Sequence, residues 1–134
     1  MTTRRQVVVA SAVAGVAAGL PLAAQAQSAP IRIGEINSYS TIPQFTLPYR
    51  MGWQLAVDET NAAGGLLGRR VEVISRDDAG KPEDATRLAT ELMTNENVAL
   101  ITGTFLSNVG LAVADFALRN RIVFVAAEPL SDAL

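Results

Sequence analysis

Six side chains that follow the apolar runs of this chain could together hold a small polar solute. They supply hydroxyl, amide, carboxylate and aromatic groups: Ser38, Phe45, Phe105, Ser107, Asn108 and Glu128. Polar groups of this kind fix a ligand's orientation, and aromatic rings form the walls of its pocket. The sequence has no histidine and no cysteine, which removes imidazole bases, His-based metal sites and disulfides. These residue types indicate binding without a cofactor or a metal.

Ser107 and Asn108 have the spacing of a carboxylate-binding loop. They follow Gly103 and stand where a helix is expected to begin, so unpaired N–H groups and the positive end of the helix dipole face the ligand. The glycine would let a ligand approach the backbone closely. The same spacing also suits a simple helix cap by Ser107, and the sequence leaves both roles open.

The aromatic and acidic candidates also have two interpretations each. Tyr39, Phe45 and Phe105 would either wall an apolar pocket or pack their loops against the sheet. Glu128, beside Pro129, would either accept a hydrogen bond from a ligand's ammonium or hydroxyl group, or form a solvent-facing or hinge ion pair.

Apolar periodicity predicts alternating strands and helices. Strands are expected at 31–37, 71–76, 98–102 and 122–126, and helices at about 49–63, 82–93 and 107–118. This alternation predicts an α/β fold, a Rossmann-like open parallel sheet with helices on both faces. Ligands bind such sheets beyond the carboxyl ends of the strands, where the strand order switches. The six candidate residues belong to those exits.

Other residues are expected to serve the scaffold. Asp77 and Asp78 are adjacent and point to opposite sides of an extended chain, so we expect a turn or a helix cap rather than an acid–base pair. Trp53 is expected in the core. The inner face of the second helix is expected to hold Ala85, Leu88, Ala89, Leu92 and Met93, and that of the third Leu111, Ala112, Phe116 and Leu118.

The stretch 61–71 is rich in glycine and leads from a helix into a strand. Glycine tolerates the left-handed backbone that often ends a helix. A nucleotide cradle needs the opposite order, with the strand first and the helix last. These glycines are therefore predicted to build a turn and to bind no cofactor.

Residues 1–26 have the pattern of an export signal. Arg4 and Arg5 precede a continuous apolar stretch at 7–22, and the small residues at 24–26 fit a cleavage site. Within this segment, Thr3 to Val8 also resembles a twin-arginine signal.

A transmembrane anchor is the alternative, but the apolar run is short and contains Pro21. We therefore expect a periplasmic protein, cleaved near Ala26 and without stable membrane insertion. Removal of the two arginines takes the formal charge from −2 to −4, which argues against nucleic-acid binding because that requires clustered cations.

Four separated segments resemble the leucine/branched-chain-type solute-binding proteins of ABC transporters. They are Ile31 to Gly34, Gly52 to Gly65, Gly68 to Val73 with Asp77-Asp78, and Val98 to Gly103 with Ser107. The resemblance implies a two-lobed protein that traps its solute by hinge closure, has no catalytic activity and delivers the solute to an ABC permease in the inner membrane. Residues 27–134 would be the N-terminal part, with the second lobe missing.

The resemblance also implies roles for particular residues. Ser107 falls on the serine that binds the ligand carboxylate, and Phe45 on an aromatic residue before the first helix. The segment 126–131 departs from the small residues and hydroxyl usual there. The ligand is therefore expected to be a small carboxylate-bearing solute, either a branched-chain or other amino acid or an aromatic acid.

Two other functions remain compatible with the sequence. One is the ligand-sensing lobe of a signalling receptor with the same fold. The other is an exported hydrolase with a Rossmann-like core, although the chain has neither a G-x-S-x-G elbow nor a histidine.

Overall fold

The computed structural model describes residues 29–133, which form a single sheet with helices on both faces. Its strands are β1 (Ile31–Asn37), β2 (Val71–Asp77), β3 (Leu100–Gly103) and β4 (Val123–Ala126). All neighbouring strands are parallel, in the order β2-β1-β3-β4. This confirms the Rossmann-like open parallel sheet. The strand order reverses between β1 and β3, so their carboxyl ends flank the switch point.

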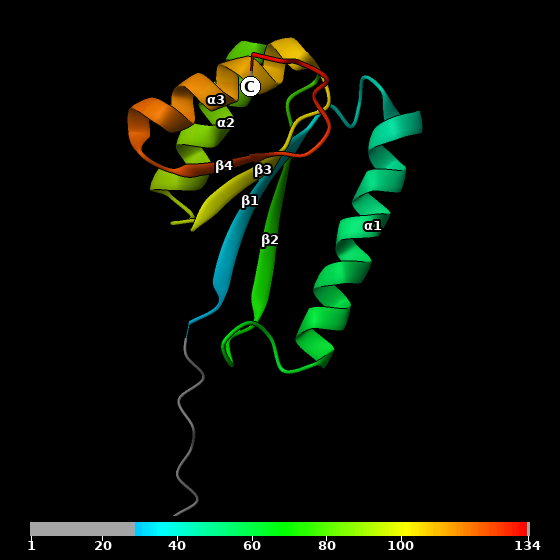
Figure 1. The fold of residues 1–134 in the computed structure, drawn as a ribbon, viewed down its shortest axis with the longest axis vertical. Coiled ribbons are helices and arrows are strands. Elements are labelled where there is room, and N and C mark those ends of the chain that lie inside the picture. Colours follow the sequence, from blue (N-terminus) through cyan, green and yellow to red (C-terminus); the bar gives the residue numbers. More distant parts are fainter. Residues whose placement is uncertain (1–28, 134) are drawn as a thin grey trace, which may run out of the picture.

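Within the described residues, the strands are connected by α1 (Pro43–Ala62), α2 (Pro82–Thr94) and α3 (Ser107–Asn120). Figure 1 shows α1 alone along one face of the sheet, with α2 and α3 together on the other. Right-handed crossovers explain this arrangement. The connection through α1 moves across the sheet from β1 to β2, whereas the connections through α2 and α3 move in the opposite direction, to β3 and then β4, so these helices lie on the opposite face. No helix in 29–133 has the length and apolar run needed to span a membrane. The predicted export signal at 1–26 lies outside the described residues.

Helix α1 begins at Pro43 rather than at residue 49, which corrects the sequence-based boundary. Pro43 stands in the first helical turn, where the proline's missing N–H has no intrahelical role. Pro48, expected to interrupt the chain before the helix, lies inside it and removes one backbone hydrogen bond. Phe45 is therefore on the first turn of α1 and not in a loop.

The apolar core lies between the sheet and the face made by α2 and α3. Its buried members are Ile36, Ala85, Leu88, Ala89, Leu92, Val98, Ile101, Val109 and Val113. The inner face predicted for α2 is confirmed for the four residues from Ala85 to Leu92. Their 3.6-residue periodicity places them on one side of the helix, which faces β1.

The inner face predicted for α3 is wrong in part. Phe116 packs against the core, but Leu111 and Leu118 are exposed. The buried residues of α3 are instead Val109, Gly110, Val113 and Ala117. Val109 and Val113 belong to the same core cluster as the inner face of α2, and the missing side chain of Gly110 leaves space for Pro129 and Thr104.

The other face of the sheet, beneath α1, carries hydrogen bonds that converge on Glu35. Tyr39 donates to Glu35 Oε1 at 3.0 Å, and Ser75 donates to Oε2 at 2.6 Å. The Trp53 indole donates to the Tyr39 hydroxyl, while Arg50 donates to Ser75 and lies over the Tyr39 ring. Burial raises the pKa of Glu35 to about 7, although Ser75, Tyr39 and Arg50 act to lower it. Helix α1 is thus attached largely through polar groups.

The stretch 61–71 forms the helix-to-strand turn that its glycines predict. The Asn61 side chain accepts the Val71 N–H at 2.8 Å and donates to the Val71 carbonyl at 2.9 Å. Gly65 has a φ of +79°, and a Cβ there would lie 2.0 Å from the Arg69 carbonyl oxygen. That oxygen accepts the Leu66 N–H at 2.8 Å, so it has no room to retreat. The turn requires glycine at 65 for both reasons.

We predict that Gly65→Ala destabilises the fold far more than Gly64→Ala does. Both positions have positive φ, but a Cβ at Gly64 would meet nothing within 4 Å. The backbone penalty alone is about 1 to 2 kcal/mol, and the overlap at Gly65 takes the loss to about 3 kcal/mol or more. Urea unfolding of both variants measures the difference. Equal losses would contradict this account of the turn.

We also predict that stability falls as pH rises from about 5 to 8 because of Glu35. Its pKa is raised in the folded state, so the stabilising contribution is complete below the unfolded value and disappears as pH rises through about 7. Its charged neighbours are Arg50 and Asp78, and the chain has no histidine to titrate in this range.

The loss approaches about 3 kcal/mol for the full shift in pKa. Glu35→Gln should remove this pH dependence, because glutamine does not titrate. Urea unfolding at pH 5 and pH 8 checks the prediction, with Glu59→Gln on α1 as the control. A pH dependence that persists in Glu35→Gln would show that another group causes it.

Candidate functional site

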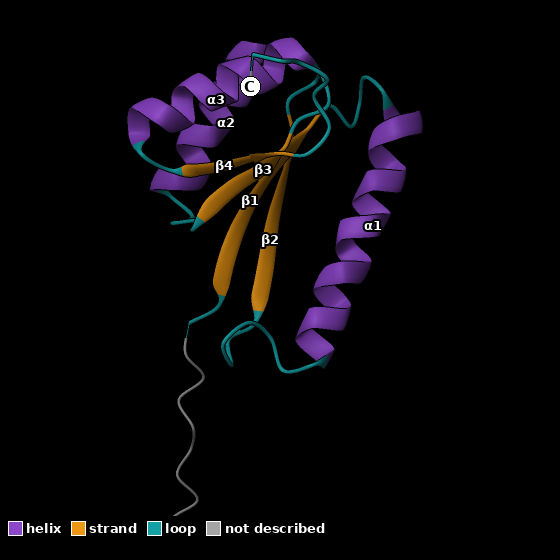
Figure 2. Cartoon of the chain, in the orientation of Figure 1, coloured by secondary structure: helices purple, strands orange, loops and turns teal. Residues whose placement is uncertain are grey.

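The last two residues of β1 hold the exits of the other strands together. The Asn37 carbonyl accepts the Asp78 N–H, just after β2, at 3.1 Å, and the Ile36 carbonyl accepts the Thr104 N–H, just after β3, at 2.6 Å. The Ala127 N–H, after β4, donates to the last carbonyl of β3 at 3.1 Å. Figure 2 shows the loops gathering where the strands converge. The strand exits that the sequence predicted therefore lie side by side.

The side chain of Asn37 reaches across the end of β3 to Glu128. Its Nδ2 donates to Glu128 Oε2 at 3.0 Å, and its Oδ1 accepts the Ser38 N–H at 2.9 Å. Asn37 is fully buried, whereas Glu128 is half-buried. The Glu128 carboxylate is thereby held at the carboxyl edge of the sheet.

Ser38 is at this edge, but its hydroxyl is already used. It is fully buried and donates to Asp78 Oδ1 at 2.6 Å, an oxygen that also accepts the Gly80 N–H at 2.7 Å. Burial raises the pKa of Asp78, and the hydrogen bonds from Ser38 and Gly80 oppose that shift. Asp77 points outward and accepts the N–H groups of Ser40 and Ala79. The two aspartates thus form turns on opposite sides, as expected.

The chain is strained where it leaves β3. Gly103 has a φ of +107°, and a Cβ there would lie 2.3 Å from the Ile36 carbonyl oxygen. Thr104 has a φ of +63°, a conformation that is costly for a β-branched residue. Its hydroxyl is buried and makes no hydrogen bond in the described part of the chain. Strain of this kind persists where the surroundings enforce it and is frequent at functional sites.

Ser107 is the first residue of α3 and does not cap it. The cap position is Leu106, which supplies no side-chain hydrogen bond, so the helix-cap interpretation of Ser107 is wrong. The Ser107 hydroxyl instead donates to the Leu130 carbonyl at 3.3 Å. Asn108 follows and is exposed. The N–H groups in this first turn have no acceptor within the helix, which leaves the end of α3 open to an anion.

Phe45 and Phe105 come together at the same edge. Their ring centroids are 5.1 Å apart with an interplanar angle of 23°, so the rings are stacked. Phe45 remains about half exposed. The pair provides a flat apolar surface beside the start of α3, and both interpretations of these residues, packing and pocket wall, are compatible with it.

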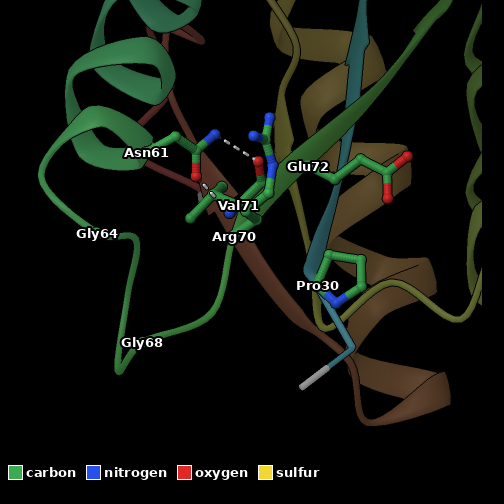
Figure 3. A pocket seen from close by; sticks show the side chains of 7 residues that line it. All are labelled: Pro30, Asn61, Gly64, Gly68, Arg70, Val71 and Glu72. Carbon is green, nitrogen blue, oxygen red and sulfur yellow. Dashed lines mark hydrogen bonds between the residues drawn. The ribbon is translucent and has the colours of Figure 1, made fainter. Parts of the chain in front are cut away.

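A hollow lies at the other end of the sheet. It measures about 610 Å³ and is lined by Pro30, Asn61, Gly64, Gly68, Arg70, Val71 and Glu72. Figure 3 shows the Asn61 side chain in this hollow, pairing with the backbone of β2. The amide is therefore committed to the scaffold. Because ligands bind open parallel sheets at the carboxyl ends, we do not assign the site to this hollow.

Two residues of the edge are not singled out by sequence pattern. Asn37 ends a strand, where a polar residue is usually the start of a loop. The sequence nevertheless indicated a role for Asn37, because a polar residue at the end of a central strand is buried and needs a hydrogen-bond partner. The sequence did not indicate a role for Thr104, since its positive φ appears only in the folded backbone. Tyr39, expected as a possible pocket wall, lies beneath α1 instead.

A family model described as periplasmic binding protein matches residues 30–133. The chain therefore belongs to the periplasmic binding protein family. Over 98 residues it is 38 % identical to the Leu/Ile/Val-binding protein homolog 7 of Brucella suis biovar 1, which covers 72 % of this chain and 24 % of that protein.

Two solved structures extend the likeness. The branched-chain amino acid transporter substrate binding protein LivJ from Streptococcus pneumoniae, in complex with isoleucine, matches with a TM-score of 0.70 and 30 % identity, over 77 % of this chain and 30 % of that one. A solute binding protein from R. palustris, in complex with 4-hydroxybenzoate, matches with a TM-score of 0.68 and 23 % identity, over 79 % and 28 %. The second likeness shows the fold alone.

The chain is much shorter than these proteins. It spans 20 % and 28 % of the length of two curated Leu/Ile/Val-binding relatives from Rhizobium johnstonii and Brucella melitensis.

We predict that Ser38→Ala destabilises the edge by about 2 kcal/mol, because it removes a hydrogen bond to a buried carboxylate. Asp78 Oδ2 is already buried without a partner among the described residues, so no spare donor compensates. Ser40→Ala is the matched control, since Ser40 is exposed and lies beside the exposed Asp77 rather than beside a buried carboxylate. Chemical unfolding of both variants measures the effect. A change within about 0.5 kcal/mol for Ser38→Ala would contradict it.

Proposed function

We propose that this chain contributes the N-terminal lobe of a solute-binding component of an ABC importer. The solute would be small and would carry a carboxylate. Membership of the periplasmic binding protein family supports a binding role, and the relatives are solute-binding proteins rather than enzymes. An export signal at 1–26 and delivery to an inner-membrane permease belong to the same proposal. Residues 27–134 would form the lobe.

The observation that carries the proposal is the open first turn of α3 beside the strand exits. Its N–H groups lack helical acceptors, and the Ser107 hydroxyl and exposed Asn108 stand at the same point. A carboxylate is stabilised there by the helix dipole and by direct hydrogen bonds. The related LivJ protein, which is solved with isoleucine, supports an amino acid as the solute.

An aromatic acid is the second candidate ligand. The stacked pair of Phe45 and Phe105 favours it, because a flat ring can extend such a stack. A protein of the same fold is solved with 4-hydroxybenzoate, although that likeness extends only to the fold. Leucine and 4-hydroxybenzoate are thus the two ligands to compare.

We predict that leucine or 4-hydroxybenzoate shifts the amide resonances of residues 103–108. Titration followed by nitrogen–proton correlation NMR detects binding in the millimolar range, which is the strength expected of a chain that spans a minor part of its relatives. Ser107→Ala should weaken binding by about tenfold, since the hydroxyl that donates to the Leu130 carbonyl in this structure would turn to donate to the ligand carboxylate. Thr90→Ala on the exposed side of α2 is the control. Absence of shifts at 103–108 with every carboxylate would overturn the proposal.

A further inference from the structure

We propose that Glu35 is a proton-binding site linked to the solute site, so that the chain takes up a proton when it binds an anionic solute. The inference rests on the proposed function, because it concerns the same carboxylate bound at the start of α3. Protonated Glu35 would favour binding, and ionised Glu35 would oppose it. The affinity for carboxylate solutes would therefore fall as the pH rises.

The Glu35 carboxylate lies directly against the loop that begins at Gly103. A Cβ placed on Gly103 would be 3.1 Å from Glu35 Oε1, at the point where β1 and β3 pair. Glu35 itself is fully buried. Ser107 is only four residues after Gly103, and four residues of extended chain span at most about 14 Å. The first turn of α3 is therefore within electrostatic range of this carboxylate.

The charge of an ionised Glu35 is not cancelled by an ion pair. Within residues 29–133 its oxygens accept the hydroxyls of Tyr39, at 3.0 Å, and Ser75, at 2.6 Å. Arg50, the cation on the same face, donates to Ser75 instead and forms no ion pair in the described part of the chain. Hydroxyl partners stabilise a carboxylate without neutralising it, so its field extends into the neighbouring loop.

The other ionisable groups around Glu35 come from α1 and from three strand exits. They are Arg50 and Tyr49 on α1, Tyr39 after β1, Asp78 after β2 and Glu128 after β4. Burial is the main cause that raises the pKa of Tyr49, and the charges of Glu35 and Glu128 add to it, so both carboxylates act on the same hydroxyl. Arg50 is the one cation in this group. An anionic solute would thus add to an excess of negative charge.

The sign of the linkage follows from the charge of the solute. Burial raises the pKa of Glu35 to about 7, so both of its forms are populated near neutral pH. A bound carboxylate brings a further negative charge, which favours the protonated form. Linkage then requires protonation of Glu35 to strengthen solute binding by the same factor. Two charges about 14 Å apart, at an effective dielectric constant of about 20 and with some screening by salt, give about a fivefold effect.

Solute titrations at pH 6 and pH 8 test the linkage on the full chain, with leucine and 4-hydroxybenzoate as the probes. Their carboxylates remain ionised at both pH values. We expect binding about threefold tighter at pH 6, because part of the fivefold effect lies outside this range. Glu35→Gln should bind equally well at the two pH values. Glu59→Gln, exposed on α1, is the matched control and should keep the difference.

A second measurement uses the unaltered chain, so it does not depend on the folding of Glu35→Gln. The side-chain carboxyl carbon resonance of Glu35, followed by NMR across the pH range, gives its pKa with and without solute. Saturating solute should raise that pKa by about 0.7, which is the fivefold factor expressed on the pH scale. A purely structural role of Glu35 would leave its pKa unchanged by the solute.

The outcomes separate the two proposals. Binding that shifts the resonances of residues 103–108 but is equally strong at pH 6 and pH 8 would overturn the linkage and leave the carboxylate site intact. A pH dependence of binding that persists in Glu35→Gln would assign it to another group and would also overturn the linkage. No shift with either solute at either pH would overturn the proposed function and this inference together.

Discussion

The close contact between the ends of β1 and β3 is the constraint on which this edge of the molecule depends. The Ile36 carbonyl meets the backbone of β3 so closely that residue 103 has no space for a side chain. The same carbonyl accepts the Thr104 N–H, and Thr104 takes a costly conformation as a result. Because the strands meet here, the buried Asn37 can cross the end of β3 and hold the loop after β4. A single crowded position thus sets the geometry of the loops from three strands.

The two faces of the sheet are stabilised by different interactions, apolar packing on one and buried hydrogen bonds on the other. On the α2 and α3 face, aliphatic side chains exclude water around Ile36 and Ile101. On the α1 face, a fully buried carboxylate accepts hydrogen bonds from Tyr39 and Ser75. Buried polar groups contribute little net stability but are costly when unpaired, so they favour one arrangement over its alternatives. The α1 face therefore fixes the position of the helix that carries Phe45.

Periodicity in the sequence was sufficient to predict the order of elements, the parallel sheet and the location of the strand exits. It failed where a tertiary contact outweighs a local pattern. Pro48 lies within a helix instead of before it, and α3 buries small residues rather than Leu111. The hydroxyl of Ser107 has a partner 23 residues away, and no local rule predicts such a pair. The hydrogen bond from Asn37 to Glu128 was not predicted for the same reason, since the two residues are 91 positions apart in the sequence.

Strand β4 has consequences for the behaviour of the chain in solution. Within residues 29–133 it pairs only with β3, so its outer backbone groups are free. Val123 and Val125 stand there at 60 % and 49 % exposure. An unpaired edge with apolar side chains is a template for adding another strand. Aggregation through this edge is accordingly a hazard when this segment is produced by itself, and a charged residue in place of either valine would reduce it.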